Sequence, residues 1–395
     1  MIHYIKIKNF YSINLQQEVS FVVDGGTPKN NSYLESDNIT LSKLNMFIGS
    51  NASGKTNLLK PFGFIKWLIN TSFAVPPSAA LPYRRFFDSK ENSGIEIRFE
   101  IENKHYTYNV EFVPERILSE KLSINQLIKT RRTDSTLFTR IFDQKTQKYV
   151  FKGEDFDCKN FAKSLSVLER SNTSMLAIGV QNVHPLSMLI AGYWDKINTN
   201  IFENGYGGEN PLDMHFNLLS LHFDETEKSK VEKILQKFDL GFDSVFLDTV
   251  TEGNQVTIRS ANEVHLFGGK KYENDIGYSS QGTKRLLTII RYVLAAIQNQ
   301  SPVILDEIEA FLHPEILREI IDMFIDPEVK AQLIFTSHSH TLMNKLNKEQ
   351  IFLCEKSNQT GSTEVFKLAD VEGVRNDQNF YNKYIAGAYG AIPRL

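Results

Sequence analysis

Cysteine is scarce in this sequence: there are two in 395 residues, Cys158 and Cys354, far apart and without CxxC spacing. The scarcity argues against both a disulfide framework and a zinc site, and it suits a reducing cytosol. Long apolar runs are also missing, because the longest, LLTIIRYVLAAI, is interrupted by Arg291 and is too short to span a bilayer. The opening stretch, MIHYIKIKNFYSI, alternates like a strand and lacks the apolar core of a signal peptide. We therefore expect a soluble, cytoplasmic protein that does not contact a membrane.

Charge of neither sign dominates, since the formal net charge is -3. This balance gives no general basis for nucleic-acid binding, although a local basic patch can be hidden in it. Two short stretches could form such a patch: YRRF at Tyr83–Phe86 and TRR at Thr130–Arg132. Solvated surface charge is the competing interpretation of both. Nucleic acid therefore remains open as a partner.

The order of the predicted elements is that of an α/β protein with a long insertion. At the front, the apolar stretch LNMFIG leads into a glycine-rich loop and then a helical pattern. In the last third of the sequence, helices alternate with the apolar strands PVILDE, AQLIFTSH and QIFLCEK. This alternation is typical of a parallel sheet. We expect the front strand and the back strands to share one sheet.

The segment between these halves follows a different pattern. GIEIRFEIENKHYTYNVEFV and TLFTRIFDQKTQKYVF are typical of two β-hairpins, the first turning at Asn103 and Lys104. ETEKSKVEKILQKFDLGF is typical of an amphipathic helix that ends in glycine. We expect a β-rich lobe followed by a largely helical stretch.

A phosphate loop is the strongest motif in the sequence. GSNASGKTN, residues 49–57, matches the pattern GxxxxGK[ST] at every fixed position. The backbone N–H groups of such a loop converge on phosphate oxygens, and the following helix directs its positive end at them. Lys55 neutralises the β- and γ-phosphate charge, while the Thr56 hydroxyl ligates Mg²⁺. The strand before the loop and the helix after it argue against a chance glycine-rich turn. The residues expected to bind ATP here are Gly49, Asn51, Ala52, Ser53, Gly54, Lys55, Thr56 and Asn57.

Two adjacent carboxylates end the apolar strand of PVILDEIEAFLHP. Asp306 stands at the carboxyl end of a predicted parallel strand, where ligands of open α/β sheets bind, and would complete the Mg²⁺ shell. Glu307 follows directly and would act on the attacking water as the general base. A strand that ends at a solvated acidic turn is the alternative. We expect Glu309 and Glu315 to be solvated charges.

A buried strand in AQLIFTSHSHTLM brings residues 336–338 to the same edge of the sheet. We expect His338 to hydrogen-bond the γ-phosphate as a catalytic residue. A strand followed by a turn rarely directs two nearby side chains at one ligand, so we interpret His340 as structural. The two histidines have no cysteine or carboxylate at ligand spacing, and we predict no metal site there.

A second anion-binding arrangement follows much later in the chain, at SSQGT. Ser280 supplies a hydroxyl, and Gly282 lies in the first turn of a predicted helix whose N-terminus attracts anions. One phosphate loop cannot use both cradles on one triphosphate from the same side. We therefore expect a two-fold homodimer in which Ser280 and Gly282 contact the ATP that the other copy holds. An ordinary Ser-Gly helix cap is the alternative.

The order of these motifs resembles the ATP-binding-cassette (ABC) class of ATPases, in the branch of the SMC, RecF and OLD types. The stretch SSQGT corresponds to the signature of this class. A transporter cassette is much shorter, and its signature comes immediately before the acidic strand. Over most of its length the chain is similar to bacterial AAA-type ATP-binding proteins of antiphage defence modules, which are related to OLD nucleases. IKIKNFYSINLQQEVSF looks like the opening strands of those proteins, and YIAGAYGAIPRL looks like their ending.

By the same resemblance, Gln181 in LERSNTSMLAIGVQN is a candidate for the Q-loop residue that contacts Mg²⁺ and the attacking water. A plain helix-surface glutamine is the alternative. The chain departs from the pattern in two places. Gln281 stands where the transporter-type signature has the first of two glycines, which implies a different approach to the γ-phosphate. The stretch after His338 lacks the acidic clusters of a Toprim nuclease domain, so any nuclease of this system would be a separate protein.

These features together predict an α/β fold, a P-loop NTPase with an ABC-type ATPase head, a mixed or parallel sheet, a β-rich N-terminal lobe and a helical insertion. Residues 1–180 would form the N-terminal half of the head, with the phosphate loop and the β-rich lobe. Residues 181–260 would form a mostly helical insertion. Residues 261–395 would form the C-terminal half, with the signature, the acidic strand and His338.

Three functions are compatible with the predicted fold and motifs. The first is a Mg²⁺-dependent ATPase with slow basal turnover, whose ATP-bound homodimer or higher oligomer is a switch or scaffold for a separate effector or nuclease; the resemblance implies antiphage defence. The second is a nucleic-acid clamp in DNA repair. The third is a degraded ATPase that only binds nucleotide, against which the intact Lys55, Asp306, Glu307 and His338 argue.

Overall fold

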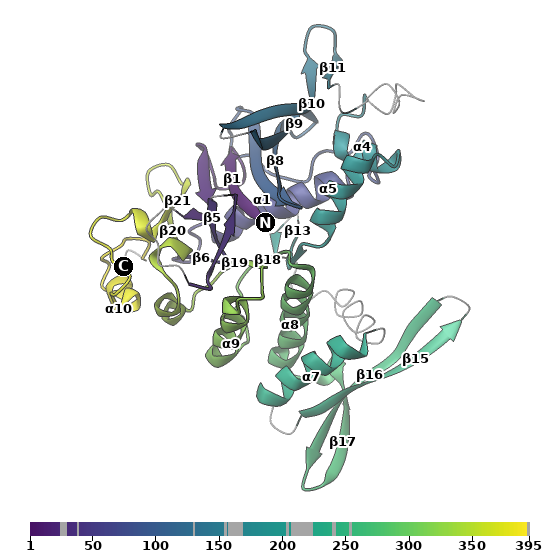
Figure 1. The fold of residues 1–395 in the computed structure, drawn as a ribbon, viewed down its shortest axis with the longest axis vertical. Helices are drawn as coiled ribbons and strands as arrows, with labels where there is room; N and C mark the ends of the chain where they lie inside the picture. The colour runs from purple at the N-terminus through teal and green to yellow at the C-terminus, as the bar shows by residue number, and fades with distance from the viewer. Residues whose placement is uncertain are drawn as a thin grey trace.

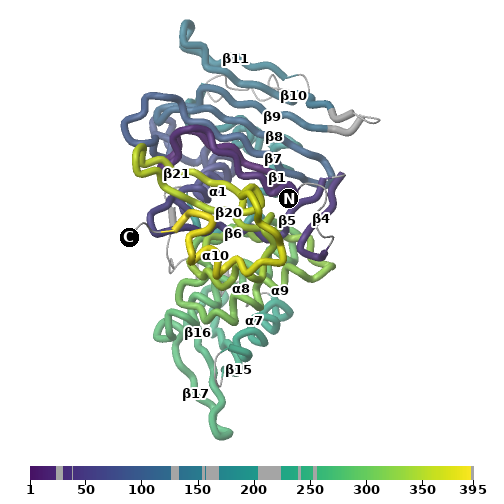
Figure 2. Tube along the Cα trace, turned by 90° about the vertical axis from the view of Figure 1, so that its left-hand side faces the viewer, coloured from purple at the N-terminus to yellow at the C-terminus, as the bar shows by residue number. Residues whose placement is uncertain are grey.

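The computed structural model of the protein describes residues 1–23, 30–37, 39–128, 131–153, 156, 169–202, 205–206, 224–238, 242–252 and 255–392. Helix α1 (Lys55–Asn70) lies at its centre, between two sheets. One hydrophobic cluster joins the helix to both of them, because it contains Phe62 of α1, Tyr108 of one sheet and Phe47 of the other. Figure 2 shows the resulting layers stacked along the long axis of the molecule.

The central sheet has six strands in the order β12-β18-β19-β6-β20-β21. β12 to β20 run parallel in that order, and β21 is antiparallel to β20. Every residue of β6, β18 and β19 is buried, as expected for a parallel sheet covered on both faces. The prediction that the front and back strands share one sheet is thereby confirmed. The bounds are β6 (Leu44–Gly49), β12 (Asn198–Thr199), β18 (Pro302–Leu305), β19 (Gln332–Thr336), β20 (Ile351–Lys356) and β21 (Thr363–Lys367).

The β-rich lobe is a seven-stranded antiparallel sheet in the order β11-β10-β9-β8-β7-β1-β2, at the top of Figure 1. Both predicted hairpins are present. The first turns at Glu102 and Asn103, which have φ of 50° and 61°, one residue earlier than predicted because Lys104 still pairs with Ile101. The bounds are β1 (Ile2–Lys8), β2 (Gln17–Ser20), β7 (Ser93–Ile101), β8 (Lys104–Val113), β9 (Arg116–Ile128), β10 (Arg131–Asp143) and β11 (Lys148–Lys152).

Helices cover the other face of the central sheet. A second hydrophobic cluster joins Leu44 and Met46 of β6 to Ile289 of α8 (Gln281–Asn299) and Ile320 of α9 (Pro314–Ile325). The predicted amphipathic helix is α7 (Glu225–Phe238), which buries Val231 and Leu235. The remaining elements are short: β3 (Val22–Val23), β4 (Tyr33–Ser36), β5 (Ile39–Ser42), α4 (Met175–Gln181), α5 (Pro185–Asp195), β13 (Ile201–Phe202), β14 (Gly205–Tyr206) and α10 (Phe380–Ile385). The described residues also contain the 3-10 helices η1 (Ile276–Tyr278), η2 (His340–Lys345), η3 (Lys348–Gln350) and η4 (Leu368–Asp370).

An arm projects from the head beside α7 and α8 (Figures 1 and 2). It is a three-stranded antiparallel sheet of β15 (Phe242–Glu252), β16 (Gln255–Phe267) and β17 (Lys270–Asp275). Residues 181–260, for which the sequence predicts a mostly helical insertion, thus contain β12 to β15 and the start of β16 beside α5 and α7. The domain boundaries at 180 and 260 remain predictions.

Among the described residues no single helix is long and apolar enough to cross a membrane, and only the pair α4–α5, bent by 107°, meets that length and hydropathy together.

A buried ion pair connects the lobe sheet to α4. Arg140 Nη2 lies 3.2 Å from Glu120 Oε2, and neither side chain is exposed to solvent. Arg140 also donates to Thr173 O at 2.7 Å, and Glu120 accepts from Tyr108 Oη at 2.8 Å and from Met175 N at 2.9 Å. Burial raises the pKa of Glu120, against the opposing charge of Arg140. The pair therefore holds the start of α4 against the lobe only while both partners are present.

We predict that Arg140→Met lowers the free energy of unfolding by about 3–5 kcal/mol, because it leaves the Glu120 carboxylate buried without its counter-charge. Urea unfolding followed by circular dichroism measures this loss. Arg318→Met is the control, since Arg318 forms an exposed ion pair with Glu315 that is worth about 1 kcal/mol at most. Equal losses in the two variants would show that the buried pair has no special role.

Candidate ATP-binding site

The phosphate loop connects the end of β6 to the start of α1. Gly54 caps the helix at φ +100°, where a Cβ would lie 2.0 Å from Thr363 Oγ1, so only glycine fits. Thr363 holds the loop from behind: its hydroxyl donates to Ser53 O at 2.9 Å and contacts Ser12 Oγ at 2.7 Å. These contacts give the loop backbone a fixed concave shape.

The Lys55 ammonium lies within this concave loop. Its Nζ donates to Gly49 O and Ser50 O, both at 3.0 Å. Burial lowers the pKa of Lys55, while the nearby carboxylates of Asp306 and Glu309 oppose this effect. Charged phosphate oxygens form stronger hydrogen bonds with an ammonium than two neutral carbonyl groups do. The loop therefore presents a cation that a polyphosphate would attract.

Thr56 and Asp306 meet between the two halves of the chain. Asp306 is 2% exposed, and its two carboxylate oxygens accept from Thr56 Oγ1 at 2.7 Å and from Thr336 Oγ1 at 2.5 Å. A hydroxyl and a carboxylate are hard oxygen ligands of the kind that Mg²⁺ prefers. The donor set thus fits the metal ion that the sequence predicts at these two residues.

Two residues that the sequence did not single out fix the backbone of the acidic strand. The Asn200 side chain donates to Asp306 O at 2.9 Å and accepts from Asp306 N at 2.8 Å. Arg285 of α8 donates to Asp306 O and Glu307 O, both at 3.1 Å. Asn200 has no motif around it, whereas Arg285 closely follows SSQGT and could have been noticed there.

Glu307 is exposed and has φ of 47°, in the left-handed region. This conformation costs a non-glycine residue about 1–2 kcal/mol, so its surroundings must enforce it. The Glu307 N–H donates to Thr336 Oγ1 at 2.7 Å, which fixes the turn. The strained turn places Glu307 in the same pocket as Lys55.

His338 lines this pocket as well, and its backbone N–H donates to Glu309 Oε1. Glu309 is therefore not the solvated charge that the sequence predicts. It is half-buried, and its buried Oε2 has no hydrogen-bond partner among the described residues. The reason is that Ile308 N bonds Thr336 O at 3.2 Å, so the chain after Glu307 folds back against the end of β19.

Glu315 and His340 lie where they were expected. Glu315 is exposed and forms an ion pair with Arg318 at 2.8 Å. The His340 ring packs on Tyr384 with 5.1 Å between ring centroids, and it does not line the pocket. Burial lowers the pKa of His340, as expected for an imidazole packed in this way.

The pocket has a volume of about 500 Å³. Gly49 and Ser53, also predicted to bind ATP, lie behind it: a Cβ on Gly49 would sit 2.2 Å from Cys354 O, and Ser53 is buried. Ser12 and Lys356 are lining residues that the motifs did not reveal. The full lining is Ser12, Asn51, Ala52, Gly54, Lys55, Thr56, Asn57, Asp306, Glu307, His338 and Lys356.

Ser280 and Gly282 do not line this pocket. Ser280 is exposed and caps α8, where its Oγ accepts from Thr283 N at 3.0 Å. Gly282 lies close to the acidic loop, since a Cβ there would be 2.9 Å from Phe311 O. Within one chain the signature is thus a helix cap, and its contact with the ATP of another copy stays a prediction.

The structure does not bring Gln181 to the pocket. Helix α4 begins at the far end of α1, where Ser174 Oγ donates to Leu68 O at 2.8 Å. At 1.5 Å per residue, Leu68 is about 20 Å along α1 from Lys55. Gln181 itself is exposed at the last residue of α4. This geometry corrects the expectation that it joins the Mg²⁺ shell and agrees with a helix-surface glutamine.

We predict that Asn200→Ala lowers the free energy of unfolding by about 1–3 kcal/mol, because a buried N–H of Asp306 loses its partner. Asn198→Ala is the matched control, since the Asn198 side chain is half-buried and its hydrogen bond among the described residues is weak, to Lys196 O at 3.4 Å. Chemical unfolding of the two variants beside the wild type makes the comparison. A loss no larger than that of the control would contradict the anchoring role of Asn200.

The chain was compared with known protein families, curated proteins and solved structures. Its sequence matches the family described as "AAA domain, putative AbiEii toxin, Type IV TA system" over residues 44–182 and 213–344. No curated protein matches it significantly in sequence.

Its structure is similar to an SmcHead solved bound to the C-winged helix domain of ScpA, with a TM-score of 0.52 and 14% identity over 93% of this chain and 97% of that one. It is also similar to the SMC head domain from Thermotoga maritima, with a TM-score of 0.42 and 13% identity over 93% and 98% of the two chains. The fold is that of a P-loop NTPase with an ABC-type head. Because the family match covers more than half of the chain, the protein belongs to this AAA-domain family of P-loop ATPases.

Proposed function

We propose that the protein is a Mg²⁺-dependent ATPase whose ATP-bound homodimer acts as a switch or scaffold for a separate effector. The observation that supports it most directly is the convergence of Lys55, the Thr56–Asp306 pair and Glu307 on one pocket. Membership of a P-loop ATPase family agrees with this chemistry.

In the proposed reaction, Lys55 exchanges its two carbonyl partners for phosphate oxygens, and the loop N–H groups hold the rest of the triphosphate. Mg²⁺ held by Thr56 and Asp306 supplies charge neutralisation for phosphoryl transfer. Glu307 orients the attacking water and accepts its proton. His338 donates a hydrogen bond to the γ-phosphate and so distinguishes ATP from ADP.

The homodimer is proposed because the signature lies outside the pocket of its own chain. Ser280 is exposed, and its helix is tied through Arg285 to the carbonyl oxygens of Asp306 and Glu307. If Ser280 contacts the phosphate of an ATP held by a second copy, that contact would also position the acidic strand of the chain to which Ser280 belongs. Binding of a partner copy and readiness for hydrolysis would be coupled through α8.

We predict that Glu307→Gln lowers the rate of ATP hydrolysis by about 100-fold or more while ATP binding is retained, because only the proton acceptor is removed. Without hydrolysis, Mg²⁺-ATP should shift the solution mass towards a dimer. Light scattering with and without Mg²⁺-ATP measures this shift.

Two further variants make the test specific. Ser280→Arg, added to Glu307→Gln, should abolish the shift because the large side chain fills the place of the partner's phosphate. Glu315→Gln, which removes an exposed carboxylate of the same acidic stretch, should leave hydrolysis unchanged. A wild-type hydrolysis rate in Glu307→Gln would refute the catalytic assignment. No mass change in any variant would refute the homodimer.

The effector and the pathway are proposed from the resemblance to antiphage ATPases of the OLD-like branch. The family description, which names a toxin of a type IV TA system, is compatible with such a role. We expect slow basal turnover, because switches of this chemistry hold ATP until a partner completes the site. Phage should form plaques less efficiently on cells that carry the wild-type gene with its neighbouring genes than on cells in which that gene carries Lys55→Ala. Equal plating over a broad phage panel would count against a defence role.

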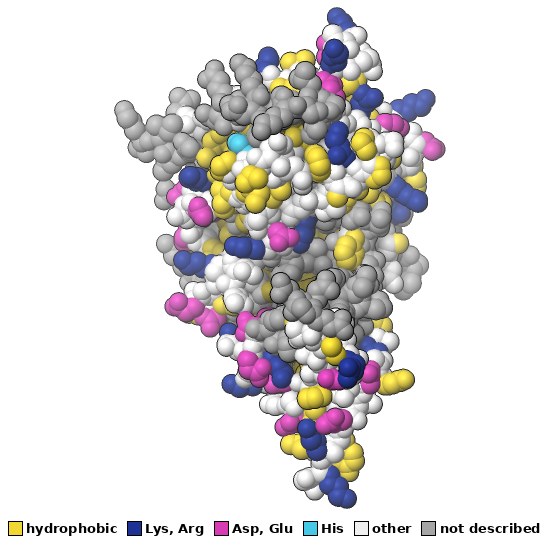
Figure 3. Space-filling model, turned by 90° about the vertical axis from the view of Figure 1, so that its right-hand side faces the viewer, with side chains coloured by type: hydrophobic (Ala, Val, Ile, Leu, Met, Phe, Trp, Pro, Cys, Tyr) yellow, Lys and Arg dark blue, Asp and Glu magenta, His cyan; other side chains and the backbone are white. Residues whose placement is uncertain are grey.

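A DNA clamp is the competing function, and the basic stretches give it little support. In YRRF, Arg84 is exposed, but Tyr83 and Phe86 are core residues. Thr130 of TRR lies outside the described residues. On the face shown in Figure 3, the described basic and acidic side chains are interspersed along the arm. DNA affinity that falls steeply with salt would favour the clamp.

A further inference from the structure

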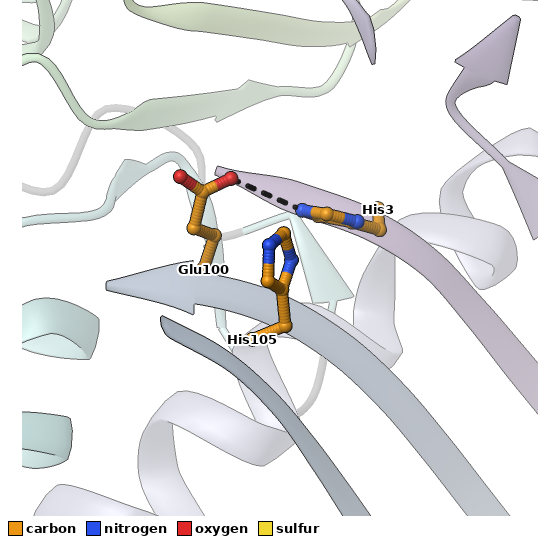
Figure 4. Close-up of side chains that lie close together, drawn as sticks. All are labelled: His3, Glu100 and His105. Atoms are coloured by element: carbon orange, nitrogen blue, oxygen red, sulfur yellow. Dashed lines mark hydrogen bonds and ion pairs between the residues drawn. The ribbon is translucent and has the colours of Figure 1, made fainter. Parts of the chain in front are cut away.

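Two histidines and a glutamate lie side by side on the lobe sheet, away from the phosphate loop (Figure 4). His3 is in β1, Glu100 in β7 and His105 in β8, and β7 runs between the other two strands. Glu100 and His105 are direct cross-strand partners. The register shifts between Ile2 and Tyr4, so His3 is the extra residue of a β-bulge. The bulge lets His3 face the other two residues.

The three side chains are almost completely enclosed. His3 is 0% exposed, His105 3% and Glu100 11%. Their ligand atoms all lie within 4.8 Å of one another. His3 Nε2 is 3.4 Å from Glu100 Oε2, and the two imidazole rings are 4.9 Å apart between centroids. Figure 4 shows the His3 ring edge directed at the Glu100 carboxylate.

A second carboxylate approaches the group from outside the sheet. Asp37 follows β4, and its Oδ2 is 2.9 Å from His105 Nε2. Ser36 Oγ, at the end of β4, donates to Glu100 Oε2 at 2.6 Å and so fixes the glutamate from the residue next to Asp37. The residues Ser36, Asp37 and Glu100 also line a pocket of about 460 Å³ that opens to solvent. A small ion therefore has a path to the group.

Hydrogen bonding alone accounts for each pair, His3 with Glu100 and His105 with Asp37, but not for their convergence. The Nδ1 atoms of His3 and His105 are buried and have no hydrogen-bond partner among the described residues. A cation held between the imidazole nitrogens and the carboxylates would explain why two histidines and two carboxylates converge here.

We propose that His3, Glu100 and His105 form a structural site for a divalent transition metal, with Zn²⁺ as the best fit, and that Asp37 completes it by moving in from beside His105. Imidazole and carboxylate together suit Zn²⁺, and four protein ligands would make a closed, non-catalytic site. Donor atoms around tetrahedral Zn²⁺ are about 3.3–3.4 Å apart. The contact of 3.4 Å between His3 and Glu100 is close to that spacing, whereas Asp37 lies outside the group whose ligand atoms are all within 4.8 Å of one another.

The site would fasten the loop after β4 to the lobe sheet, close to a junction with the central sheet. Ile2, beside His3, exchanges hydrogen bonds with Gln332 at 3.0 and 3.1 Å, and Gln332 begins β19. Bound metal should therefore stabilise the contact between the lobe sheet and the central sheet. The metal site would form whether or not the protein hydrolyses ATP.

The test is metal binding by the full chain after treatment with EDTA. We expect one Zn²⁺ per chain by elemental analysis, a tetrahedral Co²⁺ absorption spectrum, and a rise of several degrees in the unfolding temperature when Zn²⁺ is added. His105→Gln should lose the bound metal and the spectrum. Asp37→Asn, whose side chain is 41% exposed and so should fold normally, should weaken binding about tenfold or more.

Two controls separate this site from others. His265→Gln removes a single histidine–glutamate pair on the arm, at 3.5 Å, and should keep the metal. Thr56→Ala removes the hydroxyl expected to ligate Mg²⁺ and should also keep it. The proposal is overturned if the wild type binds no Zn²⁺, if His105→Gln and Asp37→Asn bind it as the wild type does, or if Thr56→Ala loses it.

Discussion

Asp306 is the residue on which both the central sheet and the proposed site depend. Its buried carboxylate accepts hydrogen bonds from Thr56 at the start of α1 and from Thr336 at the end of β19, and its backbone is held by Asn200 after β12. A buried carboxylate is costly unless such partners surround it. The residue expected to hold Mg²⁺ is therefore also the one that requires the front, middle and back of the chain to meet.

Buried charged groups in the lobe also need partners. Its strands cover α1 with a large apolar face, and the polar groups enclosed there are paired across long distances in sequence. Arg140 and Glu120 connect the sheet to α4, while His3, Glu100 and His105 gather at the edge near the central sheet. These buried charges join segments that lie apart in the sequence.

The proposed switch between two copies depends on the position of α8. One end of the helix presents Ser280 to solvent, and the next turn holds the acidic strand through Arg285. The pocket of one chain has the lysine, the metal ligands and the acidic residue, but not the signature. A single chain thus contains an incomplete site in the proposed mechanism.

The sequence by itself determined the features that lie in contiguous residues. The phosphate loop, the acidic strand and FTSH could each be recognised locally, and the apolar strands predicted the shared parallel sheet, because parallel strands are buried on both faces. Tertiary structure alone decided the partners that come from distant segments. Asn200 and Ser12 reach the site without any local pattern, Glu309 is half-buried by a backbone turn, and Gln181 is carried away by α4. The same holds for His3 and His105, whose separation in sequence hides a ligand group that strand pairing brings together.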